Sequence, residues 1–151
     1  MKRWLVIALL LAALTVLSFR LTLELIRPGG GDLVQGAEVA VPSGQKVWFL
    51  DRSTGIGGDA GRTGEGISAR FRFVAPDIGS DSADSDAISE DIMHLCQVAR
   101  LVLELENKEE ITQIVIGLAD RETVIGSTDP DVRKFFEAFR PEGETCVPEV
   151  F

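Results

Sequence analysis

The sequence predicts an α+β domain, a mostly antiparallel sheet with two helices on one face, preceded by an N-terminal transmembrane or signal-anchor helix. Three observations predict it. Segments that alternate between apolar and polar residues are interspersed with segments whose apolar residues recur at helical spacing. Glycine- and aspartate-rich turns separate these segments. The first 30 residues are far more apolar than the rest, so the 151 residues are best divided into one domain and an appendage.

The N-terminal segment starts with Lys2 and Arg3 and continues as an apolar run over residues 4–19. A retained anchor needs about 20 such residues to cross the hydrocarbon, and a helix prolonged through residues 20–26 supplies them. A cleavable signal peptide needs small residues before the cut, and no A-x-A pattern is present. We therefore favour an anchor over residues 1–27, with cleavage as the alternative. The anchor residues that we single out are Trp4, Leu9, Leu14 and Phe19.

Both alternatives place the domain outside the cytoplasm, because basic residues such as Lys2 and Arg3 stay on the cytoplasmic side of a membrane segment. The first predicts a single-pass inner-membrane protein with a cytoplasmic N-terminus and a periplasmic domain. The second predicts secretion to the periplasm after signal cleavage. In either case Pro28 ends the helix, and a glycine-rich linker follows over residues 28–45.

The domain, residues 46–151, begins with two predicted strands. Residues 46–50, KVWFL, are aromatic and β-branched, as is typical of a strand. Residues 67–74, ISARFRFV, place two phenylalanines on one face and two arginines on the other. That alternation predicts a half-solvated strand antiparallel to the first. Residues 51–66 hold six glycines and predict a hairpin loop between the two strands.

A long helix is predicted next, over residues 87–106, with its N-cap supplied by Asp84, Ser85 or Asp86. Its apolar residues recur at helical spacing: Ile88, Ile92, Leu95, Ala99 and Val102. Residues 111–118, ITQIVIGL, are nearly all apolar and predict a central strand. The segment that follows predicts a turn into a short partner strand.

A second helix is predicted from Asp129 and Pro130, because aspartate caps helices well and proline fits the first helical position. Its apolar stripe follows the spacing i, i+3, i+4, i+7: Val132, Phe135, Phe136 and Phe139. Residues 145–151, TCVPEVF, are predicted to return as an edge strand, where Pro148 is tolerated.

The two cysteines, Cys96 and Cys146, are predicted to form a disulfide, because two cysteines of a small exported domain most often pair. The bond would close a loop with 49 residues inside it, worth roughly 4 kcal/mol by chain entropy. A metal site is disfavoured because His94, the only histidine, lies two residues from Cys96 and points about 200° away around the helix. A redox dithiol would need C-x-x-C spacing, which is absent.

The charge of the domain limits its partners. The chain has 15 basic and 24 acidic residues, and residues 31–151 keep 11 and 23 of them, a net of −12. Nucleic acid is therefore not expected as a partner, since its binding depends on Lys and Arg against phosphates. The acidic surface favours basic partners, and the N-terminal helix would contact membrane lipid.

The glycines between the first two strands come close to a dinucleotide fingerprint. That fingerprint needs a following helix, and here a strand follows, so we interpret the segment as a hairpin loop. Loops often carry binding sites, which makes this one a possible contact loop for a partner. Its residues are Gly55, Gly57, Gly58 and Gly61.

The acidic stretch before and within the long helix does not fit a calcium loop, because Ile88 and Leu95 occupy positions where oxygen ligands are needed. Acids in a first helical turn favour the helix dipole instead, and this accounts for Asp86, Glu90 and Asp91. No serine lies in a G-x-S-x-G motif that a histidine could activate. We therefore predict no enzymatic activity, no cofactor and no metal.

Five stretches carry a resemblance to a known family: VAVPSGQ at 39–45, FRFVAPDIG at 71–79, LC at 95–96, IVIGLADR at 114–121 and STDPDVRKFFEAFRPEGETCVPEVF at 127–151. They resemble a family of short bacterial exported proteins with a domain of unknown function. Some members carry an acetolactate synthase label. We reject that label here, because the chain is too small for a thiamine-dependent enzyme and has no diphosphate-binding motif. The resemblance implies export and no catalytic residue.

Together these observations predict a membrane-tethered periplasmic domain without catalytic activity, an accessory or interaction module. Its partner would be a protein in or on the inner membrane, bound through the edge strand at the end of the chain or through the glycine loop. The alternative is a secreted periplasmic domain that binds a small ligand or cation through its acidic loop.

Overall fold

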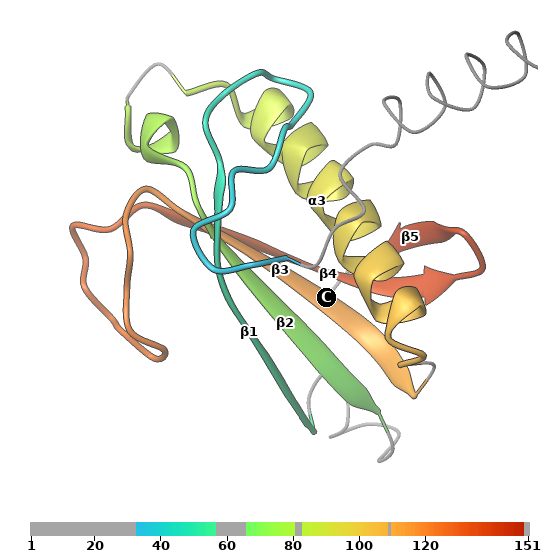
Figure 1. Ribbon diagram of the computed structural model, residues 1–151. Coiled ribbons are helices and arrows are strands. Elements are labelled where there is room, and N and C mark those ends of the chain that lie inside the picture. Colours follow the sequence, from blue (N-terminus) through green and yellow to red (C-terminus); the bar gives the residue numbers. More distant parts are fainter. Residues whose placement is uncertain (1–32, 57–65, 81–82, 109, 150–151) are drawn as a thin grey trace, which may run out of the picture. The chain divides into compact units, whose positions relative to one another are not determined.

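The computed structural model describes residues 33–56, 66–80, 83–108 and 110–149, which form a five-stranded sheet with one α-helix on one of its faces (Figure 1). The elements in chain order are β1 (Trp48–Ile56), β2 (Ile67–Val74), the 3-10 helix η1 (Pro76–Gly79), α3 (Ser85–Leu105), β3 (Ile111–Ala119), β4 (Lys134–Glu142) and β5 (Thr145–Pro148).

The sheet is mixed, and its strands are ordered as in the sequence, from β1 to β5. Three of its four strand pairs are antiparallel, as predicted. The pair β2–β3 is parallel, because α3 carries the chain back to the starting edge between these two strands. The prediction of an α+β domain with a mostly antiparallel sheet is therefore confirmed at this level.

The core lies between α3 and one face of the sheet. In β2, Phe71 and Phe73 point into it and are almost fully buried, whereas Arg70 on the other face is exposed, as the alternation predicts. The stripe of α3 packs against them through Ile92 and Leu95, both fully buried. The strand β3, nearly all apolar, takes the central place expected of it.

Capping residues set the limits of α3 close to those predicted. The Asp84 side chain accepts a hydrogen bond from the backbone N–H of Asp86 at 3.0 Å, which caps the first turn. At the other end Asn107 adopts a left-handed φ of 55°, and Lys108 donates its backbone N–H to the Leu103 carbonyl. This is a common way for a helix to stop.

The prediction of a second helix from Asp129 onward is wrong. Residues 134–142 form strand β4, and the turn before it starts at Asp129 and Pro130. Phe135, Glu137 and Phe139 alternate with outward-facing neighbours, so the segment has a strand period as well as a helical one. Pairing with β3 on one side and β5 on the other selects the strand, because it provides hydrogen-bond partners for both edges of β4. Within the described ranges α3 is thus the one α-helix.

Three boundaries also differ from prediction. The strand predicted at 46–50 continues to Ile56, because residues 51–56 pair with β2. The predicted linker over 28–45 is, from residue 33 onward, part of the fold: Val41 is buried in the core and Glu38 pairs with Trp48. No partner strand forms over 119–127 beyond the end of β3; the chain there makes a loop instead.

The predicted edge strand at the end of the chain is confirmed as β5, which lies outermost beside β4. The predicted anchor residues Trp4, Leu9, Leu14 and Phe19 lie outside the described residues. Among the residues that are described, no helix has both the length and the hydropathy needed to span a membrane.

Candidate functional site

The face of the sheet opposite α3 is the candidate site. Strand alternation places its residues opposite the buried phenylalanines, and cross-strand pairing sets them side by side: Arg70 with Val115, Arg72 with Gly117, and Gly117 with Phe136. We call this surface the open face and define it by Arg70, Arg72, Val115, Gly117, Lys134 and Phe136.

A cavity of about 260 Å³ opens on this face. It lies where the loop of residues 120–133 borders the sheet. Its apolar lining comes from four strands and the loop: Leu50, Phe73, Val115, Leu118, Ala119, Val124, Ile125, Phe135 and Phe136. A register shift between Phe49 and Asp51 leaves Leu50 without a partner in β2, which is the geometry of a β-bulge. Gly117 on the central strand has no side chain to fill the space.

Three large apolar side chains around this cavity are unusually exposed. Val124 is 78% exposed, Ile125 is 63% and Phe136 is 77%. Single exposed apolar residues are common on proteins and mean little. A group of them around one concavity is different, since such patches mark interaction or ligand sites. These residues therefore identify the open face as the candidate contact surface.

Arg72 fixes the loop to the sheet. Its Nε donates to Asp51 Oδ1 at 2.7 Å, its Nη2 pairs with the other oxygen of the same carboxylate, and its Nη1 donates to the Thr123 carbonyl at 2.7 Å. The hydrogen bond with Asp51 raises the pKa of the guanidinium above its usual range. Arg72 is thus occupied, and it holds the residue just before Val124 against the sheet.

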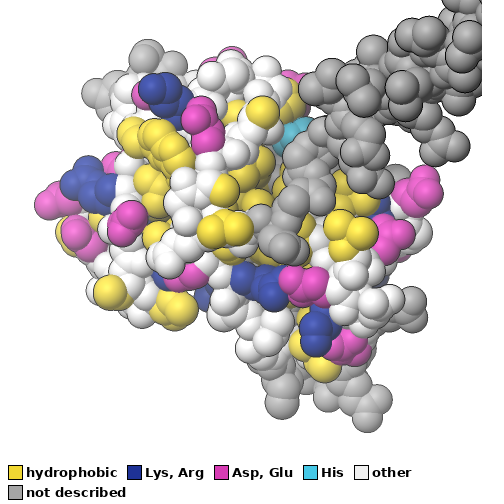
Figure 2. Space-filling view, viewed as in Figure 1, with side chains coloured by type: hydrophobic (Ala, Val, Ile, Leu, Met, Phe, Trp, Pro, Cys, Tyr) yellow, Lys and Arg dark blue, Asp and Glu magenta, His cyan; other side chains and the backbone are white. Residues whose placement is uncertain are grey.

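The other two cations that line the cavity, Arg70 and Lys134, form no ion pair with a described residue. Arg70 is exposed, and its side chain has no hydrogen-bond or ion-pair partner within the described part of the chain. Lys134 donates to the neutral Ser127 carbonyl at 2.7 Å and is also exposed. Of the described residues that line the cavity, none is acidic. By contrast, Figure 2 shows acidic, basic and hydrophobic side chains interspersed over the face of the molecule that it presents.

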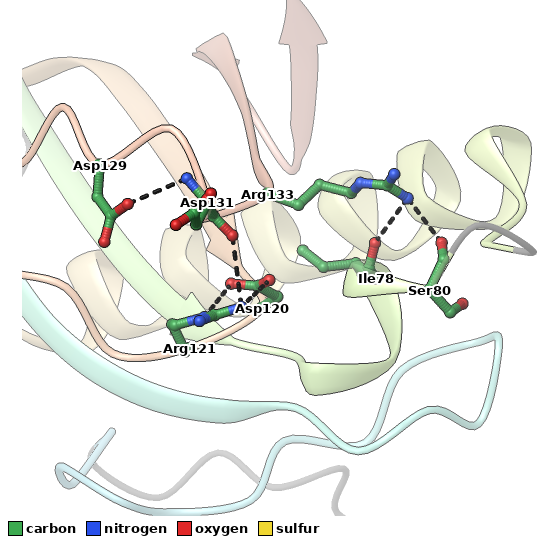
Figure 3. A network of polar contacts seen from close by, with 7 residues as sticks. All are labelled: Ile78, Ser80, Asp120, Arg121, Asp129, Asp131 and Arg133. Carbon is green, nitrogen blue, oxygen red and sulfur yellow. Dashed lines mark hydrogen bonds and ion pairs between the residues drawn. The ribbon is translucent and has the colours of Figure 1, made fainter.

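A polar network fixes the two ends of the 120–133 loop (Figure 3). Arg121 donates to both carboxylate oxygens of Asp120 at 3.1 Å, and to the Asp131 carbonyl at 3.4 Å. The backbone N–H of Asp120 donates to the Arg133 carbonyl at 3.1 Å. The Asp129 carboxylate accepts the N–H of Asp131 at 3.0 Å. The loop is therefore closed at its base by contacts between its own ends.

The same network joins the loop to η1. Arg133 donates to the Ile78 and Ser80 carbonyls at 3.3 and 2.6 Å (Figure 3). The Asp120 side chain is only 7% exposed, and the hydrogen bond from Arg121 lowers the pKa of its carboxyl. A Cβ at Gly79 would lie 3.0 Å from Asp120 Oδ2, so a larger residue there would have to displace the Asp120 side chain.

Among the acids of α3, Asp91 has a structural role. Asp91, which was expected only to favour the helix dipole, is fully buried. It accepts hydrogen bonds from the Ser43 N–H at 2.9 Å, from the Ser43 hydroxyl and from the Gln45 amide at 2.6 Å. Over the described ranges no group of three or more potential metal-ligating side chains comes together. Asp91 is a structural acceptor for the segment before β1.

The predicted disulfide is present and joins Cys96 of α3 to Cys146 of β5, with the two Cα atoms 6.3 Å apart. Both residues are buried. The predicted contact loop is only partly described. Gly55 lies in β1 and pairs with Ser68, away from the cavity lining, and Gly57, Gly58 and Gly61 lie outside the described residues.

The open face itself was not predicted from the sequence. The signal for it is Val124-Ile125, two apolar β-branched residues in an otherwise polar turn segment. Phe136 is the other exposed apolar residue of this surface, and the predicted second helix places it in the buried stripe instead. Only the strand assignment of β4 places Phe136 beside Gly117 on the exposed face.

The fold and the site define a small, disulfide-linked α+β domain with a partly apolar, basic surface on the helix-free side of its sheet. A family model described as a family of unknown function (DUF6497) matches residues 27–151, and the chain belongs to that family. This confirms the resemblance as far as a domain of unknown function is concerned. No curated protein and no solved structure gives a significant match.

Proposed function

We propose that this chain is a non-catalytic interaction domain, held at the outer side of the inner membrane by its N-terminal segment, and that it binds a protein partner through the open face. One observation carries the proposal. Val124, Ile125 and Phe136, all largely exposed, gather around a single cavity. Because exposed apolar patches are costly and rare on isolated soluble domains, this surface is best explained by a partner that covers it.

The extracytoplasmic location is supported by the disulfide and by the basic, then apolar, start of the chain. Disulfides persist in oxidising compartments and are rare in the reducing cytosol. The Cys96–Cys146 bond and an N-terminal segment with Lys2 and Arg3 before an apolar run fit the same location. In this proposal the domain is an accessory subunit or partner of an inner-membrane complex.

The alternative, a secreted domain that binds a small ligand or cation through the acidic loop, has less support. Asp91 already accepts three hydrogen bonds from Ser43 and Gln45, so it has little capacity left for a cation.

Site-specific photocrosslinking tests the contact surface. A photoreactive amino acid is placed at position 136 or 125 of the full chain in its native cells, with position 105 as the control. Leu105 on α3 is 69% exposed, close to Ile125 and Phe136 in exposure but on the other side of the sheet. We expect positions 136 and 125 to crosslink one identifiable protein, and Phe136→Ser to abolish its co-purification. Equal crosslinking from all three positions, or none from 136 and 125, contradicts the proposal.

Fractionation tests the anchor separately. Membrane retention that resists carbonate extraction is the expected result, because a spanning helix is not released by alkaline washing. Recovery of a shortened, soluble chain would instead establish signal cleavage and remove the anchor from the proposal.

A further inference from the structure

We infer that the partner presents an acidic segment to the open face, in which one large apolar side chain enters the cavity and flanking carboxylates meet Arg70 and Lys134. This inference rests on the proposed function and adds the chemistry of the partner to it. It follows from the size of the cavity, from the charges beside it and from the rigidity of its wall.

The cavity suits the anchor side chain of a protein. Its volume of about 260 Å³ is smaller than most sites that enclose a whole small ligand. Protein interfaces commonly have one central pocket that takes an aromatic or aliphatic anchor and is surrounded by a polar rim. Here the pocket is bordered by Val124, Ile125 and Phe136, with cations beside it. The arrangement matches such an interface.

The charges beside the cavity select an acidic partner. Arg70 has no partner within the described residues, and Lys134 contacts only a backbone carbonyl. Residues 31–151 carry a net charge of −12, so two available cations beside an acid-free cavity run against the character of the rest of the domain. An acidic segment would be attracted there and repelled elsewhere, which gives both orientation and specificity.

The net charge of the domain alone suggests a basic partner. The cations beside the cavity favour an acidic partner at the open face instead. They also disfavour a symmetric dimer through the open face. A two-fold interface would bring Arg70 and Lys134 of both copies into one buried region, and like charges there are costly. A second copy therefore fits the surface less well than an acidic segment of another protein.

The wall of the cavity is held in place before binding. Arg72 joins the Thr123 carbonyl to the sheet at 2.7 Å, and Lys134 joins the Ser127 carbonyl at 2.7 Å. These two contacts flank Val124 and Ile125, so the apolar wall needs little ordering when a partner arrives. A preorganised site retains more of its interaction energy as affinity.

Two matched nine-residue peptides test the inference directly. Each has a central phenylalanine, flanked by aspartate and glutamate in one and by lysine in the other, with a fluorescent label at its end. Binding to the purified full chain in detergent is measured by fluorescence polarisation. We expect the acidic peptide to bind about tenfold or more tightly than the basic one, and its affinity to fall as salt is raised. Equal affinities, or preference for the basic peptide, overturn the inference.

Variants in which the charge of one cation is reversed test the same inference from the side of the domain. Arg70→Glu should weaken the acidic peptide about tenfold and strengthen the lysine peptide, a reciprocal change that simple misfolding does not produce. Lys108→Glu is the matched control, since Lys108 is an exposed cation beyond the end of α3 and outside the cavity lining. It should leave both affinities unchanged. If Arg70→Glu changes neither peptide, the inference fails.

The photocrosslinked partner separates this inference from the proposed function. Crosslinks from position 136 should map to an acidic segment with a large apolar residue. A map to a neutral or basic segment, or to a second copy of this chain, overturns the inference while the open face remains a contact surface. Absence of any crosslink from positions 136 and 125 overturns the proposed function itself.

Discussion

A buried carboxylate on α3 holds the segment before β1 in place. Asp91 is fully buried and accepts three hydrogen bonds from Ser43 and Gln45, which together satisfy most of its acceptor capacity. The segment that contains these donors also places Val41 in the core. One side chain therefore links residues nearly 50 positions apart in the sequence.

We expect Asp91→Ala to destabilise the domain by roughly 2–4 kcal/mol, because a buried position loses the carboxylate that accepts three part-buried hydrogen bonds from Ser43 and Gln45. Asp86→Ala is the control. Asp86 is an exposed acid in the first turn of the same helix, and its loss should cost no more than about 1 kcal/mol. Denaturant unfolding of both variants measures the difference. Similar effects from the two substitutions would contradict the structural role of Asp91.

Asp120 makes a pH-dependent contribution to stability. Its pKa in the folded domain is lowered, chiefly by the hydrogen bond from Arg121, so folding favours the ionised form. A lowered pKa stabilises the fold above the unfolded value of about 3.9, and the contribution is lost as pH falls through the folded pKa.

We therefore expect Asp120→Asn to lower the melting temperature at pH 6–8, with the difference from wild type narrowing below about pH 4. Glu122→Gln serves as the control, since Glu122 is exposed and has no hydrogen-bond or ion-pair partner in the described part of the chain. Melting curves across this pH range decide the matter. A gap between wild type and Asp120→Asn that stays constant down to pH 2 would refute the assignment.

At the scale of elements, β4 presents different surfaces on its two faces. Phe139 is fully buried against the core, whereas Phe136 is 77% exposed on the open face. A helix with the same residues in one stripe would bury both. Strand geometry separates them, because residues an odd number of positions apart point to opposite faces.

This difference predicts opposite outcomes for two similar substitutions. Phe139→Ala should cost about 3–5 kcal/mol of unfolding free energy, since it leaves a cavity in the core. Phe136→Ala should change stability by less than about 1 kcal/mol, since its side chain is already in solvent. Chemical denaturation gives both values. Large losses from both would favour the helical stripe and contradict the strand.

At the scale of the whole domain, the disulfide ties the end of the chain to the helix. Cys96 lies on α3 and Cys146 on β5, and the loop that they close contains β3 and β4. β5 is short and outermost in the sheet, so sheet pairing alone holds it weakly. The crosslink compensates by restricting the unfolded chain.

Replacement of both cysteines by alanine should lower the free energy of unfolding by roughly 4 kcal/mol, with β5 the first element to lose protection. Hydrogen exchange shows which element loses protection first. Reduction of the wild-type domain should lower the free energy of unfolding by a similar amount. An alanine variant as stable as the oxidised domain would show that the bond adds nothing.

Much of the fold could be predicted from local pattern. The alternation of β2, the apolar stripe of α3, the continuous apolar run of β3 and the pairing of two cysteines each have one dominant physical interpretation. The pattern of residues 132–139 has two interpretations, because Phe135 and Phe139, four positions apart, share a face in a helix and also in a strand. Local pattern cannot choose between them.

The candidate site was less predictable than the fold. Burial and exposure of Asp91, Phe136 and Val124 depend on neighbours far away in the sequence, as do the bulge at Leu50 and the attachment of the 120–133 loop to the sheet by Arg72. A carboxylate on a helix is a surface charge or a buried acceptor according to what packs over it.

The sequence by itself determined the local elements whose residues carry a single periodicity, the cysteine pair and the acidic balance of the domain. The tertiary structure alone decided that β4 is a strand and that the helix-free face combines apolar side chains with two available cations. The physical reason is that hydrogen-bond partners and burial are supplied by other segments, so an ambiguous stretch acquires its conformation, and a surface its composition, only when the sheet is assembled.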